Sequence, residues 1–165
     1  MNTITDCIGQ TEMALKGIPK RHKVKKIKSD SLRVLEELMH KRQRSAGVAE
    51  KIYYEDRTAN GLTKCVVDWI KIHGGQAERI NTMGRPITTP NGIRWLRSTS
   101  TAGSADISAT IKGRSVKIEI KIGTDRQSAE QKQYQKDIEN AGGIYLIIRR
   151  FDEFYMWWHE KGCNL

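Results

Sequence analysis

Two carboxylates and one ammonium group stand at a spacing that suits chemistry on a phosphate. Asp106 begins a run of alternating residues, and Glu119 and Lys121 lie two positions apart in the next run. Two neighbouring carboxylates repel each other, and a hard divalent cation bound through oxygen relieves that repulsion. A lysine beside them can position a water or stabilise the negative charge that grows on an attacked phosphate. The alternative is an ordinary charged surface with no chemical role.

A β-hairpin is the element expected to hold these residues. The runs 106–111 and 115–122 alternate between apolar and polar residues, with Lys112, Gly113 and Arg114 between them. Successive strand side chains point to opposite faces of a sheet, so one face is expected to be core and the other charged.

Two registers keep the apolar residues together. A turn at Lys112–Gly113 would place Asp106 opposite Glu119, whereas a turn at Gly113–Arg114 would place it opposite Lys121. The second register is preferred, because Gly113 then occupies the first central position of a type II′ turn, which needs a positive φ. In both registers the two carboxylates and the lysine cluster.

Four segments resemble, in order, the motifs of a known nuclease family. They are Gly-Ser-Ala-Asp-Ile at 103–107, Lys-Ile-Glu-Ile-Lys at 117–121, Gln-Ser-Ala-Glu-Gln at 127–131 and Ala-Gly-Gly at 141–143. Together they resemble the virus-type replication-repair nuclease (VRR-NUC) domain of the PD-(D/E)XK phosphodiesterase superfamily. The resemblance covers roughly residues 60 to 150. It departs from the superfamily pattern at Ala105, where the superfamily name has proline, and in lacking a glutamate at the start of the preceding helix.

The resemblance implies a fold, an activity and a set of site residues. The implied fold is a restriction-endonuclease-like α/β sandwich with a central mixed β-sheet flanked by helices. The implied activity is Mg²⁺-dependent DNA nuclease action in phage-like replication, repair or recombination, with Mn²⁺ expected to substitute. Asp106 and Glu119 would hold the metal, Lys121 would be the catalytic lysine, and Gln131 would be the helical member of the site. A non-catalytic nucleic-acid-binding module that retains the nuclease fold is the alternative.

Composition favours one domain and a polyanionic partner. With 165 residues, 38% of them hydrophobic, the chain can bury one modest core, which we expect in residues 58–165 after a basic, partly helical extension at 1–57. The formal net charge of +10 suits DNA. The spacing of the cysteines and histidines indicates neither disulfides nor a structural zinc, and the sequence has no membrane-spanning run. We expect a cytoplasmic protein; a homodimer is an open alternative.

The remaining elements follow from periodicity and capping signals. Helices are expected from Ser31 to about Arg44, around 62–70, after the capping box of Ser128 and Gln131, and over 151–158. Strands are expected at 76–81 and 144–148, the latter buried on both faces. The glycine- and proline-rich segment 82–102 is expected to be an irregular DNA-contacting loop. The residues expected to bind nucleic acid are Arg79, Asn81, Arg85, Arg94, Arg97, Lys23, Lys25 and Lys26.

Overall fold

The computed structural model describes residues 28–48, 51–81, 84–96 and 101–162. The predicted DNA-binding residues Lys23, Lys25, Lys26 and Arg97 lie outside these ranges, as does most of the expected extension at 1–57.

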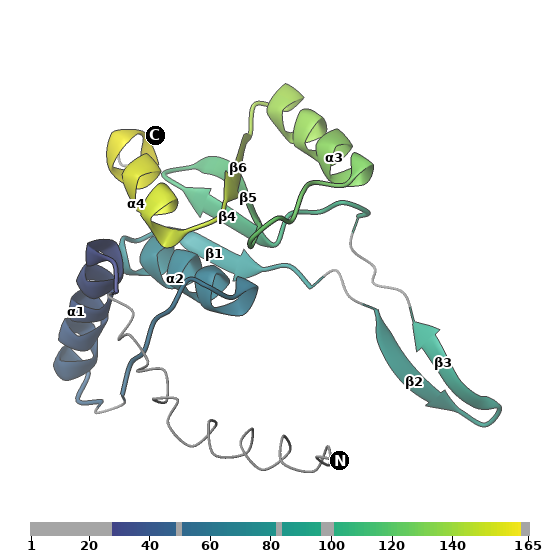
Figure 1. Cartoon of the computed structure of the whole chain (residues 1–165), viewed down its shortest axis with the longest axis horizontal. Coiled ribbons are helices and arrows are strands. Elements are labelled where there is room, and N and C mark those ends of the chain that lie inside the picture. The colour runs from purple at the N-terminus through teal and green to yellow at the C-terminus, as the bar shows by residue number, and fades with distance from the viewer. Residues whose placement is uncertain (1–27, 49–50, 82–83, 97–100, 163–165) are drawn as a thin grey trace, which may run out of the picture.

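A mixed four-stranded sheet forms the centre of an α/β fold (Figure 1). Its strands are β1 (Gln76–Arg79), β4 (Ile107–Ile111), β5 (Arg114–Ile120) and β6 (Ile144–Ile148), in the order β1-β4-β5-β6. The pairs β1–β4 and β4–β5 are antiparallel, and β5–β6 is parallel. The expected mixed sheet flanked by helices is therefore confirmed.

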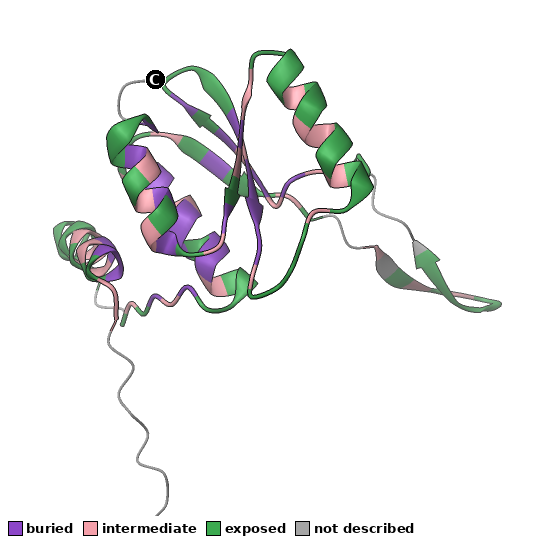
Figure 2. Cartoon of the chain, turned by 45° about the horizontal axis from the view of Figure 1, so that its top comes forward, coloured by how far each residue is buried: buried purple, intermediate pink, exposed green. Residues whose placement is uncertain are grey.

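Helices lie on both faces of this sheet. On one face α2 (Ala59–Ile72) and α4 (Phe151–Glu160) pack against the apolar side of the strands, and α1 (Asp30–Ser45) packs against α2 and α4. On the other face α3 (Ala129–Asn140) lies beside β6. Figure 2 shows that burial concentrates on the strands and on the sides of α2 and α4 that face them.

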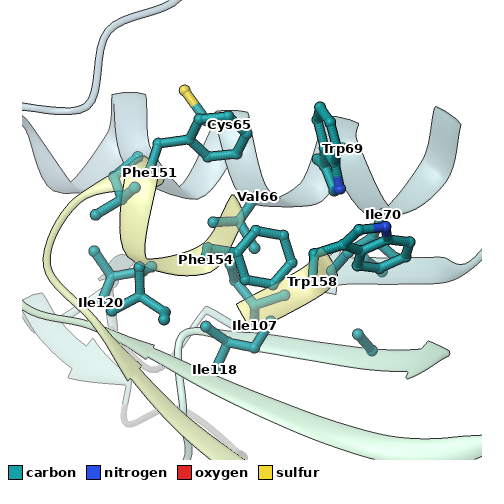
Figure 3. Close-up of a cluster of buried hydrophobic side chains, with 14 of the residues drawn as sticks. Cys65, Val66, Trp69, Ile70, Ile107, Ile118, Ile120, Phe151, Phe154 and Trp158 are labelled. Atoms are coloured by element: carbon teal, nitrogen blue, oxygen red, sulfur yellow. The ribbon is translucent and has the colours of Figure 1, made fainter. Parts of the chain in front are cut away.

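The main core lies between the sheet and α2 and α4 (Figure 3). Trp69 of α2 is fully buried there and forms edge-to-face contacts with Phe151 and Trp158 of α4. Ile107 and Ile118 reach the same core from β4 and β5.

The β4–β5 turn uses the register that was not preferred. Ile111 pairs with Arg114 and Ile107 with Ile118, so the two-residue turn is Lys112–Gly113. The φ angles of Lys112 and Gly113 are 47° and 80°, the pattern of a type I′ turn. The predicted Gly113–Arg114 turn is therefore wrong. A type I′ turn with glycine at its second central position has a backbone twist that matches the right-handed twist of the two strands.

Segment 82–102 contains regular structure that the sequence analysis did not expect. Strands β2 (Arg85–Thr89) and β3 (Gly92–Leu96) form a separate two-stranded antiparallel sheet joined by Pro90–Asn91. Figure 1 shows this hairpin projecting away from the central sheet. The expected irregular loop is wrong for residues 85–96, because Pro90 lies in the turn and Pro86 lies in an isolated two-stranded ribbon, and both positions tolerate proline.

Smaller expectations were met in part. Helix α2 begins at Ala59 and is capped by the side chain of Thr58, which accepts the Gly61 N–H. Strand β6 is not buried on both faces, since it lies at the sheet edge and Ile147 is 38% exposed. Cys65 is a buried free thiol. No helix formed by the described residues is long and apolar enough to cross a lipid bilayer.

Candidate active site

Strand pairing holds Asp106 in place from both sides. Continuing the β4–β5 register by one pair sets Asp106 opposite Glu119. The side-chain oxygen Oδ2 of Asp106 accepts a hydrogen bond from the backbone N–H of Ile120 at 2.9 Å. The backbone carbonyl of Asp106 accepts one from the N–H of Ile80 at 2.7 Å. Directly opposed residues have Cβ atoms about 5 Å apart. The two carboxylates that the sequence analysis singled out are therefore cross-strand neighbours.

Glu119 is buried, and its carboxylate has three side-chain neighbours. Only 2% of the residue is exposed. Its Oε1 lies 3.0 Å from Lys121 Nζ and 2.5 Å from Gln131 Nε2, and its Oε2 lies 3.4 Å from the Tyr145 hydroxyl. Burial raises the pKa of Glu119 and the charge of Asp106 adds to this, while the hydrogen bonds from Lys121 and Tyr145 act in the opposite direction. The site thus holds a costly buried charge.

Lys121 is the cation of the site and is 5% exposed. Its ammonium contacts Glu119, the Gln131 Oε1 at 2.9 Å and the Asp125 carboxylate at 3.4 Å. Burial lowers the pKa of Lys121, but the carboxylates of Glu119 and Asp125 outweigh burial and leave the pKa raised. The ammonium therefore stays charged beside the carboxylates of Glu119 and Asp125.

Gln131 both caps its helix and belongs to the site. Its Oε1 accepts the Ser128 N–H at 3.0 Å while the Ser128 hydroxyl accepts the Gln131 N–H at 3.2 Å, which completes the predicted capping box. Its Nε2 donates to Glu119. The amide oxygen of Gln131 thus serves both the cap and Lys121, and its amide nitrogen serves Glu119.

The start of α3 is brought to the strands by a close backbone approach. Gly103 has a φ of +77°, and a Cβ at this position would lie 2.4 Å from the backbone of Glu130 and 2.7 Å from the Gln131 nitrogen. Only glycine fits such an approach. The segment that leads into Asp106 therefore packs directly on the helix turn that carries Gln131.

Three residues of this region were not singled out from the sequence. Tyr145 reaches Glu119 from β6, and Asp125 reaches Lys121 from the loop after β5. Arg149 donates to the carbonyls of Gly123 and Asp125 at 3.0 and 2.9 Å and so holds that loop. Tyr145 carries the only polar tip in the run 144–148. A single hydroxyl in an apolar strand could have marked Tyr145 as a candidate site residue. Its contact with Glu119 could not be predicted, because the sequence does not give the register of β6 beside β5.

The residues predicted to bind nucleic acid do not all gather at this site. Arg79 is exposed and pairs with the core residue Ile107, so strand alternation places it on the sheet face opposite to Glu119. Asn81 is exposed just beyond β1. Arg85 belongs to β2, and Arg94 is exposed on β3 of the projecting hairpin.

The donor set fits Mg²⁺ better than a metal that needs a closed protein cage. Within the described ranges, no three His, Cys, Asp or Glu side chains form a group that could hold a metal ion. Mg²⁺ commonly takes one or two carboxylates and completes its shell with water and substrate phosphates. Asp106, which is half-buried, and Glu119, whose pKa is raised by burial and by Asp106, could supply such a pair.

No model of a known protein family matches the chain, and no curated protein is significantly similar to it. Function is therefore argued from the residues of the site.

Proposed function

We propose that the chain is a Mg²⁺-dependent nuclease that hydrolyses phosphodiester bonds in DNA, with the restriction-endonuclease-like fold of the VRR-NUC domain. One observation carries the proposal. Asp106, Glu119, Lys121 and Gln131, which come from three separate sequence motifs, meet at one end of the β4–β5 hairpin. A surface of unrelated charges would not be expected to bury a glutamate and a lysine together.

Each residue has a chemical role in this proposal. Asp106 and Glu119 would hold Mg²⁺, which when bound would polarise the phosphate and acidify a water. The Lys121 ammonium stabilises negative charge that develops on the attacked phosphate. Gln131 holds Glu119 and Lys121 at fixed positions through its two amide atoms. Tyr145 fixes the second oxygen of Glu119 from β6.

DNA is the proposed substrate because of the charge of the chain. The net charge of +10 favours a polyanion through counterion release. The roles in replication, repair or recombination, and a preference for branched or single-stranded DNA, are part of the proposal and depend on the resemblance. A homodimer stays an open alternative.

A second candidate is a nucleic-acid-binding module that does not cleave. One observation favours it: Glu119 is already neutralised by Lys121 and hydrogen-bonded by Gln131 and Tyr145. A carboxylate satisfied in this way has less need of a metal. The two candidates share the fold and the DNA partner, and they differ in turnover and in metal affinity.

Cleavage of a DNA panel tests the proposal. Single-stranded, duplex, flap and four-way-junction DNAs would be incubated with MgCl₂, MnCl₂ or EDTA. We expect cleavage with either metal and none with EDTA. Asp106→Asn and Glu119→Gln each replace a charged oxygen ligand at nearly constant volume, so turnover should fall roughly 1,000-fold or more, about 4 kcal/mol of transition-state stabilisation.

The matched control is Thr110→Ala, an exposed position on β4, the strand that directly follows Asp106; alternation places it on the same sheet face as Asp106. It should cleave like the wild type. Folding of all variants would be checked by thermal unfolding, and DNA affinity should persist in both site variants. Wild-type turnover in Asp106→Asn or Glu119→Gln would contradict the assignment. Binding of every DNA without cleavage under any metal would favour the non-catalytic module.

A further inference from the structure

The projecting hairpin has an apolar face with no cover among the residues that the structure describes. Directly opposed residues of an antiparallel pair share a face, so the pairs Pro86–Trp95 and Thr88–Ile93 lie together. Ile93 is 80% exposed and Trp95 is 63% exposed. Pro86 and Thr88 are exposed as well. We refer to these four residues as the hairpin face.

An isolated hairpin of this kind gains stability from a partner. Two strands alone are marginally stable in water, because they bury too little apolar surface. Figure 1 shows β2–β3 extending from the central sheet, with the hairpin tip remote from α1, α2 and α4. A large aromatic ring and an isoleucine exposed side by side are typical of an interaction surface.

Charge indicates what kind of partner fits. No aspartate or glutamate occurs between Arg79 and Asp106, whereas this stretch carries Arg85, Arg94 and Arg97. Arg94 is exposed on the face of the hairpin opposite to Trp95. A cationic ribbon without a single carboxylate suits a polyanion, and it would suit a second copy of this basic chain poorly.

We propose that the hairpin face binds unpaired nucleobases of DNA, with Trp95 as the stacking surface. Reading base edges in a duplex groove needs several hydrogen-bonding side chains, and the face offers only the Thr88 hydroxyl and the single N–H donor of the Trp95 indole. An indole ring and flanking apolar side chains instead stack on exposed bases without regard to sequence. The inference rests on the proposed function in that the partner is DNA; it adds the surface that would hold unpaired bases and the residue, Trp95, on which they would stack.

Equilibrium binding of the full chain in EDTA tests this preference without cleavage. The probes are a fluorescent single-stranded 20-mer of mixed sequence and the same sequence as a duplex. Trp95→Ala should weaken single-strand binding by roughly 5- to 100-fold, since stacking on an aromatic residue contributes on that scale. Duplex binding should change by less than about 3-fold, and Trp95→Phe should retain most single-strand affinity because it keeps an aromatic face.

Two controls separate stacking from other effects. Tyr53→Ala removes an exposed aromatic ring elsewhere on the molecule and should leave both affinities unchanged. Arg94→Ala should weaken single-strand and duplex binding to similar extents, because a phosphate contact does not distinguish them. Replacement of one adenine by 2-aminopurine in the single strand gives a direct readout, since stacking on Trp95 should quench its fluorescence and Trp95→Ala should abolish the change.

Unchanged single-strand affinity in Trp95→Ala, or equal losses on single strand and duplex, would overturn the inference. The hairpin face could instead be covered by a second copy of the chain, and analytical ultracentrifugation of the free protein tests this alternative. A wild-type dimer that becomes a monomer in Trp95→Ala would also overturn the inference. The outcome is separable from that of the proposed nuclease. If the chain cleaves DNA with metal but Trp95→Ala binds single strands normally, only the inference about Trp95 is contradicted. If single-strand binding depends on Trp95 but no DNA is cleaved, only the proposed nuclease activity is contradicted.

Discussion

The hairpins β4–β5 and β2–β3 are built alike and surrounded differently. Each is an antiparallel pair joined by a two-residue turn. In β4–β5 the isoleucines of one face are buried against α2 and α4, while on the other face Glu119 is hydrogen-bonded to Gln131 of α3. In β2–β3 the apolar residues Ile93 and Trp95 are exposed.

In the proposed nuclease, this difference would correspond to two requirements of an enzyme that acts on a large polymer. Groups that do chemistry must be held to within a fraction of an ångström, and packing on both faces of β4–β5 provides that rigidity. Groups that meet an extended, variable substrate gain from reach and exposure, which a projecting ribbon provides. Comparison of matched substitutions in the two hairpins tests this division.

The largest contrast is expected for isoleucine truncation. Ile118→Ala removes a fully buried side chain from β5 and should lower the free energy of unfolding by about 2–5 kcal/mol. Ile93→Ala changes an exposed position of β3 and should stay within about 0.5 kcal/mol of wild type. Urea unfolding followed by far-UV circular dichroism measures both. A loss of several kcal/mol in Ile93→Ala would mean that the hairpin packs on the rest of the chain.

Two glycines with similar backbone angles should differ next. Gly103 and Gly113 have φ angles of +77° and +80°, where an alanine costs roughly 1–2 kcal/mol. At Gly113 nothing lies within 4 Å of an added Cβ, so Gly113→Ala should cost that amount only. At Gly103 the Cβ would strike the Glu130 backbone, so Gly103→Ala should cost about 3 kcal/mol or more and should also reduce turnover.

Thermal unfolding and cleavage rates of the two glycine variants would be measured side by side. Equal stability losses would show that α3 can move away from residue 103 without cost. In that case the coupling of this helix to the strand that carries Asp106 would be weaker than the packing indicates.

The capping box provides a finer comparison within the site. Gln131→Ala and Ser128→Ala each remove half of the box and should each cost about 0.5–2 kcal/mol of stability. Only Gln131 also contacts Glu119 and Lys121. Gln131→Ala should therefore lower turnover at saturating DNA by about 10-fold or more, or about 1.4 kcal/mol, while Ser128→Ala should cleave at nearly the wild-type rate at low temperature. Normal cleavage by Gln131→Ala would leave it a structural residue.

The smallest expected effect concerns salt. Arg94→Ala should reduce the slope of the logarithm of DNA affinity against the logarithm of salt concentration by about one, the value for one lost phosphate contact. The matched control is Lys112→Asn, which removes one positive charge from the turn of the other hairpin, β4–β5. Asparagine tolerates the positive φ of residue 112, so this substitution should not strain the backbone. Joint neutralisation of Lys23, Lys25 and Lys26 tests the N-terminal residues in the same assay. An unchanged slope in Arg94→Ala would remove this arginine from the DNA interface.

Alternation and capping in the sequence determined most of the local structure. The strict period of two over 106–122 predicted a hairpin with one apolar and one charged face, and the pairing of Ser128 with Gln131 predicted the helix start. These features are determined by neighbours in the chain, because strand alternation and helix caps involve residues only a few positions apart. The mixed α/β class followed from the order of such elements.

Tertiary structure decided what the local patterns left open. Either turn at residues 112–114 satisfied the alternation, and only the folded hairpin set Asp106 opposite Glu119. The contact of Tyr145 with Glu119 depends on the register of β6 beside β5. A helix separates these two strands in the sequence, so no local pattern of residues determines their register. The hairpin β2–β3 was not predicted, because prolines usually end strands. Both strands of an isolated two-stranded ribbon have an outer edge without a hydrogen-bonded neighbour, and such an edge tolerates proline. Long-range pairing therefore decided which charges meet and which apolar residues remain exposed.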